Sequence, residues 1–235
     1  MANPIFTSDG LIQILRWVHF MAGIVWIGHL YYFNFSQTPF FAEADGTTKS
    51  AVIRGLVPRA LWWFRWGAAF TFFSGLFILH LMSQPERGGI SVFQTSYGVL
   101  ILLGAALGSI MAANVWFIIW PKQKIIIASA LAVASGGQAD PRAADAGARA
   151  SVASRTNVLF SIPMLFFMGA SRHLALPVSP ETNFMSLFLV LTVLILLIQL
   201  NAMFGKIGPM KSIAGVIHLG LVLTVVLYGI ASAML

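Results

Sequence analysis

The sequence predicts an all-α integral membrane protein, built as a bundle of six transmembrane helices. Of its 235 residues, 58% are hydrophobic and only 9% are charged, whereas a soluble domain carries about 25% charged residues. The apolar residues gather in six blocks, each close to the roughly 20 residues that a helix needs to cross a bilayer. The alternating segments of about ten residues that are typical of a membrane barrel are not found. We therefore expect residues 1–235 to form a single transmembrane domain embedded in a lipid bilayer.

The six blocks give the spans, and the connections between them give the orientation. We place the spans at about 10–35, 60–83, 97–120, 156–175, 183–204 and 212–234. Ten basic residues lie in the connections that follow the first, third and fifth spans: Lys49, Arg54, Arg59, Lys122, Lys124, Arg142, Arg149, Arg155, Lys206 and Lys211. The connections on the other side hold only Arg87 and Arg172. Because basic connections stay in the cytoplasm, this asymmetry predicts that both termini lie outside, an N-out/C-out topology.

The longest connection, at about 121–155, is expected to be a cytoplasmic loop. Its first part, PKQKIIIASALAVAS, could continue the third helix or lie along the membrane interface. The following GGQADPRAADAGARA is small, polar and rich in helix breakers, as mobile loops are. The net charge of +7 fits basic cytoplasmic connections of this kind, and we expect no nucleic-acid partner.

Four histidines fall within the expected spans, at two depths. His29 and His218 lie at nearly matching depth toward the cytoplasmic side, and His19 and His80 both lie in the outer half. Two imidazoles at one level on different helices can ligate a haem iron from both faces. The absence of cysteine excludes thiolate ligands and covalently attached c-type haem. The pattern therefore predicts one or two haem b groups with these histidines as iron ligands, although a buried histidine can also be a hydrogen-bonded structural residue.

Three arginines are candidates for the same cofactor. Arg16 lies one turn before His19, Arg172 stands at the outer end of the fourth span, and Arg65 lies near the cytoplasmic end of the second. Guanidinium groups pair with carboxylates, and haem carries two propionates. Alternatively, Arg16 and Arg65 could extend to the nearby membrane interface, which costs a long side chain little.

A second polar group lies toward the cytoplasmic ends of the spans. Arg65, Asn114 and Asn157 could form a pocket for a small anionic or amide-rich molecule. They could equally cap and bridge helices, and the sequence does not separate the two.

Four motifs resemble the membrane domain of the bacterial membrane-bound urate oxidases, also called urate hydroxylases. They are WVHFMAGIVWIG (17–28), ALWWFRWGAAFTFFSG (60–75), IMAANVWFIIWPKQK (110–124) and SRTNVLFSIPMLFFMGASRH (154–173). In that family a C-terminal cytochrome c domain follows the membrane domain, and this chain carries no Cys-x-x-Cys-His motif. The resemblance thus implies a multi-pass protein of the bacterial inner membrane, working with a separate c-type cytochrome or a larger membrane complex.

Three functions follow as expectations. The first is a haem b-binding electron-transfer protein connected to the respiratory chain. The second is an oxidoreductase that oxidises urate and uses an external cytochrome. The third is a non-catalytic accessory subunit of a respiratory membrane complex, in which the histidines serve packing alone.

Overall fold

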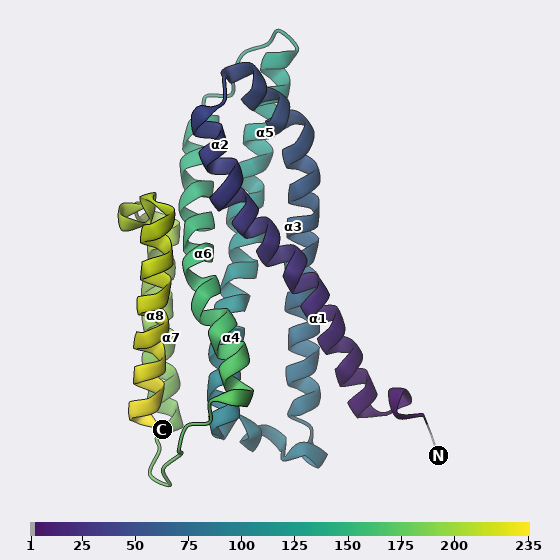
Figure 1. The fold of residues 1–235 in the computed structure, drawn as a ribbon, viewed down its shortest axis with the longest axis vertical. Helices are drawn as coiled ribbons and strands as arrows, with labels where there is room; N and C mark the ends of the chain where they lie inside the picture. The colour runs from purple at the N-terminus through teal and green to yellow at the C-terminus, as the bar shows by residue number, and fades with distance from the viewer. Residues whose placement is uncertain (1–2) are drawn as a thin grey trace.

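The computed structural model describes residues 3–235 as long helices that run side by side (Figure 1). The α-helices are α1 (Ser8–Tyr31), α2 (Thr38–Glu43), α3 (Gly46–Met82), α4 (Ser96–Ala113), α5 (Trp120–Ala134), α6 (Ala143–His173), α7 (Phe184–Phe204) and α8 (Ile213–Met234). Two π-helical segments, η2 (Tyr32–Gln37) and η5 (Asn114–Ile119), join α1 to α2 and α4 to α5. Short 3-10 turns are η1 (Pro4–Phe6), η3 (Pro85–Arg87), η4 (Gly89–Gln94) and η6 (Gly208–Lys211).

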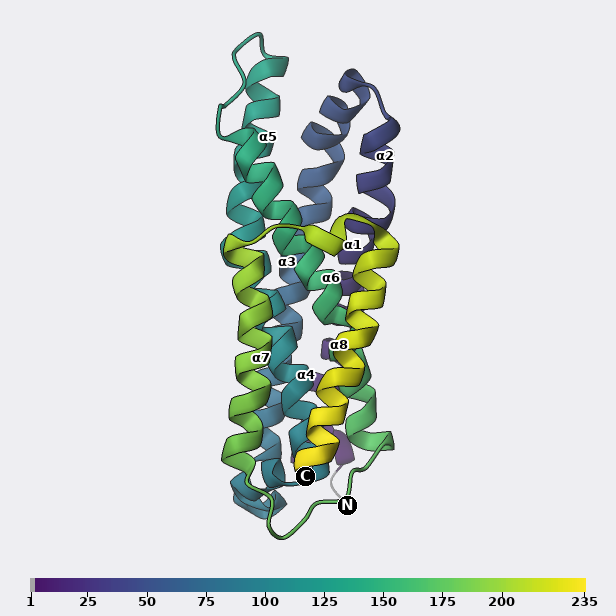
Figure 2. The ribbon, with the colours of Figure 1, turned by 90° about the vertical axis from the view of Figure 1, so that its left-hand side faces the viewer.

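The prediction of an all-helical bundle with six potential spans is confirmed. Within residues 3–235, six helical stretches are long and apolar enough to cross a membrane: Ser8–Glu43, Gly46–Met82, Ser96–Ala134, Ala143–His173, Phe184–Asn201 and Ile213–Met234. Helix α1 begins and helix α8 ends at the same end of the bundle, as an even number of spans requires (Figure 2). The first four stretches extend well past the predicted spans, all at the end away from the termini.

In the connection at about 121–155, the first part continues the third helix, which is one of its two predicted alternatives, whereas the part predicted as a mobile loop is helical from Ala143 onward. The helical run that begins with α4 continues through α5 to Ala134, and α6 already begins at Ala143. Only residues 135–142 lie between the two helices. The gap between the helices holds Gly136, Gly137 and Pro141, while the flanking residues are rich in alanine, which has the highest helix propensity and outweighs Gly147 within α6.

Five of the long helices begin at a residue whose side chain accepts a hydrogen bond from a backbone N–H of the first turn. Such N-caps satisfy donors that the helix itself leaves unpaired. The capping residues are Thr7, Asp45, Thr95, Asn183 and Ser212. At Asp45, the hydroxyl and backbone N–H of Thr48 both donate to the carboxylate and hold its pKa below the usual value.

Helix α6 is the centre of the bundle. It packs against α4, α5, α7 and α8, and its residues 155–161 are buried without interruption. Helices α7 and α8 cover one side of it, and α1 and α3 pair on another (Figure 1). The α1–α3 pair is close because Gly67 has no side chain. A Cβ atom there would lie 3.0 Å from the Trp26 backbone nitrogen and 3.1 Å from the Ala22 carbonyl oxygen.

Both π-helical segments end two residues before a proline. Pro39 follows η2, and Pro121 follows η5. A proline ring inside a helix collides with the carbonyl of the residue four positions earlier, here Phe35 and Phe117, and offers it no N–H. A wider π turn relieves that collision without ending the helix, and such turns are frequent at functional sites.

Candidate functional site

A cavity of about 320 Å³ opens between α1, α3, α4 and α6 in the half of the bundle that holds the termini. We call it the terminus-side cavity. Its walls are mostly apolar, with polar and small residues at a few positions. The residues used below are Arg16, His19, Trp26, Ser109, Gly75, Tyr97, Gly108, Met164, Met168 and Arg172.

The imidazole of His19 is oriented by helix α3. Its Nδ1 atom lies 3.2 Å from Ser74 Oγ, and that hydroxyl donates to the Phe70 carbonyl oxygen at 2.6 Å. Because the hydroxyl proton of Ser74 is committed, its oxygen accepts from His19 Nδ1–H. The Nε2 atom of His19 therefore keeps its lone pair, which is the form of imidazole that binds a metal.

A glycine holds the same ring against the α3 backbone. A Cβ atom at Gly75 would lie 3.1 Å from His19 Cε1 and 3.4 Å from His19 Nδ1. A methyl group at this position would require the imidazole to shift by a few tenths of an ångström. Ser74 and Gly75 together fix both the hydrogen bond and the plane of the ring.

The polar side chains around the cavity carry positive charge. Arg16 lies one turn before His19, and Arg172 lies at the end of α6 with its guanidinium carbon 4.2 Å from the centre of the Tyr97 ring. Within the described chain, the salt bridges join Arg87 to Asp9, Arg142 to Asp140 and Arg149 to Asp145. The two arginines at the cavity thus have no carboxylate partner among residues 3–235 and are available to an anionic group.

One donor in the cavity wall has no acceptor. Trp26 is 1% exposed, and its Nε1 atom is buried without a hydrogen-bond partner. An unpaired buried donor costs about 1–3 kcal/mol. Such a cost in a cavity wall is consistent with an acceptor that a bound molecule would supply.

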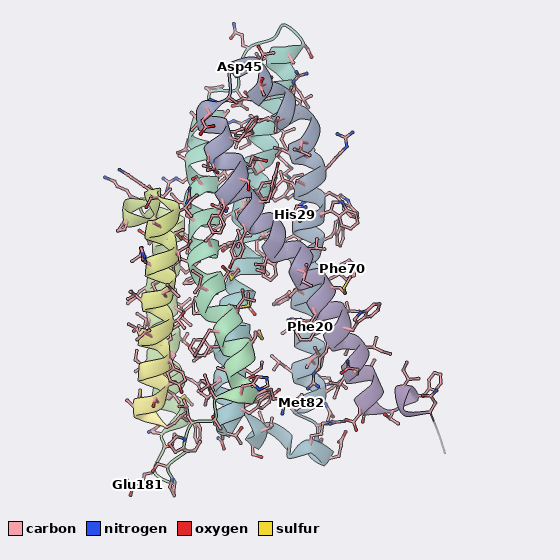
Figure 3. The ribbon with its side chains drawn as sticks, viewed as in Figure 1. Phe20, His29, Asp45, Phe70, Met82 and Glu181 are labelled. Atoms are coloured by element: carbon pink, nitrogen blue, oxygen red, sulfur yellow. The ribbon has the colours of Figure 1, made fainter. Side chains whose placement is uncertain are left out.

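The other three predicted iron ligands do not line this cavity. His29 is half-buried in the last turn of α1, where its Nδ1–H donates to the Val25 carbonyl oxygen at 2.7 Å (Figure 3). His80 is exposed near the end of α3, and its Nε2 lies 3.3 Å from Gln84 Nε2. His218 is exposed on α8, which packs on α6 and α7, whereas α1 packs on α3.

The structure therefore does not bring His29 and His218 together, because α6 lies between their helices (Figure 1). His19 and His80 also differ, since only the first faces the cavity. No group of three or more His, Cys, Asp or Glu residues in the part of the chain that is described could hold a metal ion. Any metal here would depend on a cofactor that brings its own ligands.

The predicted pocket of Arg65, Asn114 and Asn157 is replaced by two separate contacts. Asn114 Nδ2 donates to Asn157 Oδ1 at 2.8 Å, and Asn114 and Gln199 exchange two hydrogen bonds of 2.9 and 2.6 Å. Arg65 instead lies over the Trp120 ring, 3.5 Å from its centre. The three residues thus bridge helices, and none of them lines the terminus-side cavity or the second cavity described next. Gln199, a long side-chain amide within the apolar fifth span, is the sequence signal for the amide network.

A second cavity, of about 260 Å³, lies at the opposite end of the bundle. It opens between the η2–α2 segment, α3, α5 and α6, and we call it the loop-side cavity. Three side-chain amides line it: Asn34, Gln37 and Gln123. Sequence reasoning missed this site, although the two prolines after the π segments mark the turns that build it.

Comparison with known proteins gives one family. The family described as urate oxidase N-terminal matches residues 89–229, more than half of the chain, from η4 to near the end of α8. The match includes Tyr97, Gly108 and Arg172 of the terminus-side cavity. No curated protein and no solved structure matches the chain.

Proposed function

Because the chain belongs to the urate oxidase N-terminal family, we propose that it is a membrane redox protein that binds haem b in the terminus-side cavity through His19. The observation that carries this proposal is the state of the His19 ring. Its Nδ1–H is bound to Ser74, and its free Nε2 belongs to a ring that lines a cavity flanked by unpaired arginines. A hydrogen bond on the far nitrogen is the usual support of a metal-binding histidine.

The residues around the cavity suit the apolar ring and the negative charge of haem b. The group is a flat apolar ring with two carboxylates at one edge, and the cavity has mostly apolar walls with Arg16 and Arg172 at its edge. The absence of a side chain at Gly108 leaves room beside the α4 backbone. Met164 and Met168 of α6 line the same cavity, and a methionine thioether would be able to serve as a further ligand to haem iron.

Each group of this chain then has a defined task. His19 would hold the iron, and Ser74 and Gly75 would keep its ring oriented. Arg16 and Arg172 would bind the carboxylates, and the apolar wall would exclude water. When bound, haem b supplies a one-electron couple between ferrous and ferric iron.

The side of the membrane toward which the terminus-side cavity lies follows from the proposed topology. The basic connections lie at the end away from the termini, so the positive-inside rule assigns that end to the cytoplasm. The terminus-side cavity would then lie toward the outer face of a bacterial inner membrane. A c-type cytochrome or a larger membrane complex at that face is the partner that we propose.

The family match also favours a second function, the oxidation of urate with an external cytochrome as electron acceptor. The unpaired arginines would suit an anionic substrate as well as haem propionates. Urate-dependent reduction of soluble cytochrome c by membranes that carry this protein supports it. Unchanged urate under those conditions contradicts it.

The experiment for the leading function is an optical spectrum of the purified full-length protein, oxidised and then reduced with dithionite. Haem b bound through His19 predicts a sharp α-band on reduction and a b-type pyridine haemochrome. A colourless preparation that reconstitution with haemin leaves colourless contradicts haem binding. If such a preparation co-purifies with an oxidase, it is instead an accessory subunit.

A further inference from the structure

The loop-side cavity is lined by side-chain amides, several of whose polar atoms have no hydrogen-bond partner among residues 3–235. Gln37 and Gln123 line it and make no hydrogen bond among the described residues, and Gln37 Oε1 is buried. Asn34 is 3% exposed, and its Nδ2 donates to the Leu30 carbonyl and to Ser154 Oγ, both at 2.8 Å. Its Oδ1 accepts nothing. The cavity therefore offers free amide groups where a buried polar group is normally paired.

The backbone is specially shaped at this cavity. Phe33, Asn34 and Gln37 come from η2, and Ile119 comes from η5, so both π-helical segments contribute to the wall. A π turn is less favourable than an α turn and persists where it positions side chains. Here the η2 turn directs two amides into one space.

The chemistry of the wall defines the class of ligand. No Asp, Glu, Lys, Arg or His lines the loop-side cavity, so a charged ligand would lose its hydration without gaining a counter-charge. Side-chain amides present a donor and an acceptor side by side, which matches the N–H and C=O edge of a cyclic amide. Phe33 and Phe64, whose ring centres lie 5.4 Å apart, add flat apolar surface for a ring.

We propose that the loop-side cavity binds an uncharged cyclic amide of the purine or pyrimidine base class. The same wall rejects urate, which is an anion at neutral pH. This site is separate from the terminus-side cavity and does not depend on haem. Water also fills polar cavities. Binding of such a base is distinguished from filling by water because it is saturable and specific.

The test is equilibrium dialysis of the purified full-length protein in detergent at pH 7.5, with radiolabelled hypoxanthine, uracil and urate. Hypoxanthine or uracil should bind saturably at one site per chain, and urate should bind at least tenfold more weakly. Haem content is measured on the same samples and should not change with any of these ligands. Absence of saturable binding by both neutral bases, or equal binding of urate, overturns the proposal.

Three substitutions of one kind locate the site. Gln37→Leu and Gln123→Leu should each weaken binding of the neutral base about tenfold, because each removes an amide that lines the cavity. Gln94→Leu is the matched control, since Gln94 is exposed in η4 at the other end of the bundle. Thermal unfolding shows whether each variant is folded. If one of the two cavity variants fails to fold, the other still allows the comparison with Gln94→Leu. Binding that survives both cavity substitutions, or that falls equally in the control, contradicts this location.

Discussion

The Nδ1 atom of His19 on α1 lies 3.2 Å from the hydroxyl oxygen of Ser74 on α3. This contact joins the two helices that form one side of the terminus-side cavity. It also fixes the imidazole form that can bind iron, because the Ser74 proton already goes to the Phe70 carbonyl. The proposed function depends on this relationship.

Replacing Ser74 by alanine should weaken haem binding while leaving His19 in place. Loss of such a supporting hydrogen bond typically lowers metal affinity by about 10–100-fold. Haem titration of the apoprotein measures the change. Ser109→Ala is the control, since Ser109 lines the same cavity but donates only to the Ala105 carbonyl of its own helix. Equal losses in the two variants would mean that the Ser74 contact has no special role.

The buried amide pair of Asn114 and Gln199 should contribute to stability as one unit. Asn114→Leu leaves the Gln199 amide without its partner, so we expect a loss of about 0.5–2 kcal/mol in unfolding free energy, the range found for polar contacts between membrane helices. Adding Gln199→Leu should restore part of that loss, because the Gln199 amide is then no longer left unpaired, while Asn157 Oδ1 still lacks its donor. Unfolding in mixed detergent micelles measures Asn114→Leu, Gln199→Leu and the double variant. Strictly additive losses would show that the two side chains act independently.

Among the glycines of α1 and α3, Gly67 is the one at which the backbones of the two helices lie closest together. Gly67→Ala should destabilise the protein by about 1–3 kcal/mol, as overpacking does, because its methyl group meets backbone atoms that cannot move alone. Gly28→Ala is the matched control in α1, where nothing lies within 4 Å of the added Cβ. There alanine should be neutral or slightly stabilising. Thermal unfolding decides between them, and a harmless Gly67→Ala would contradict the close helix contact.

Arg65 should act through the Trp120 ring and not through the cofactor. Arg65→Met removes a cation–π contact of 3.5 Å and should lower stability by about 0.5–2 kcal/mol, with haem content unchanged. Arg54→Met, on the same helix but exposed and bonded only to Ser50, should have little effect. Loss of haem from Arg65→Met would instead restore the role predicted from sequence.

The spans were predictable because composition changes sharply at a membrane boundary. The fifth and sixth expected spans, 183–204 and 212–234, agree with α7 and α8 to within one residue at each end. The first four helices are longer than predicted because they continue beyond their apolar blocks through residues that still favour helix. At 143–150, for example, alanine outweighs the polar residues.

The site was only partly predictable. Position along a span gives the depth of a residue but not the neighbour that its side chain faces. His29 and His218 share a predicted depth, yet α6 separates their helices. His19 differs from them through Ser74 and Gly75, which lie more than fifty residues away in the sequence. The loop-side cavity depends on two π turns, and Pro39 and Pro121 mark their positions without giving their shape.

The most direct test of the central claim is the ratio of haem to protein in four single variants: His19→Ala, His29→Ala, His80→Ala and His218→Ala. All four proteins are purified from the same haem-sufficient cells, and pyridine haemochrome absorbance is divided by protein concentration. We expect His19→Ala to retain less than about a tenth of the wild-type haem, since it removes the protein's ligand to the iron, and the other three to retain nearly all of it. Full haem in His19→Ala, with losses in His29→Ala and His218→Ala, would place the cofactor elsewhere and contradict the assignment.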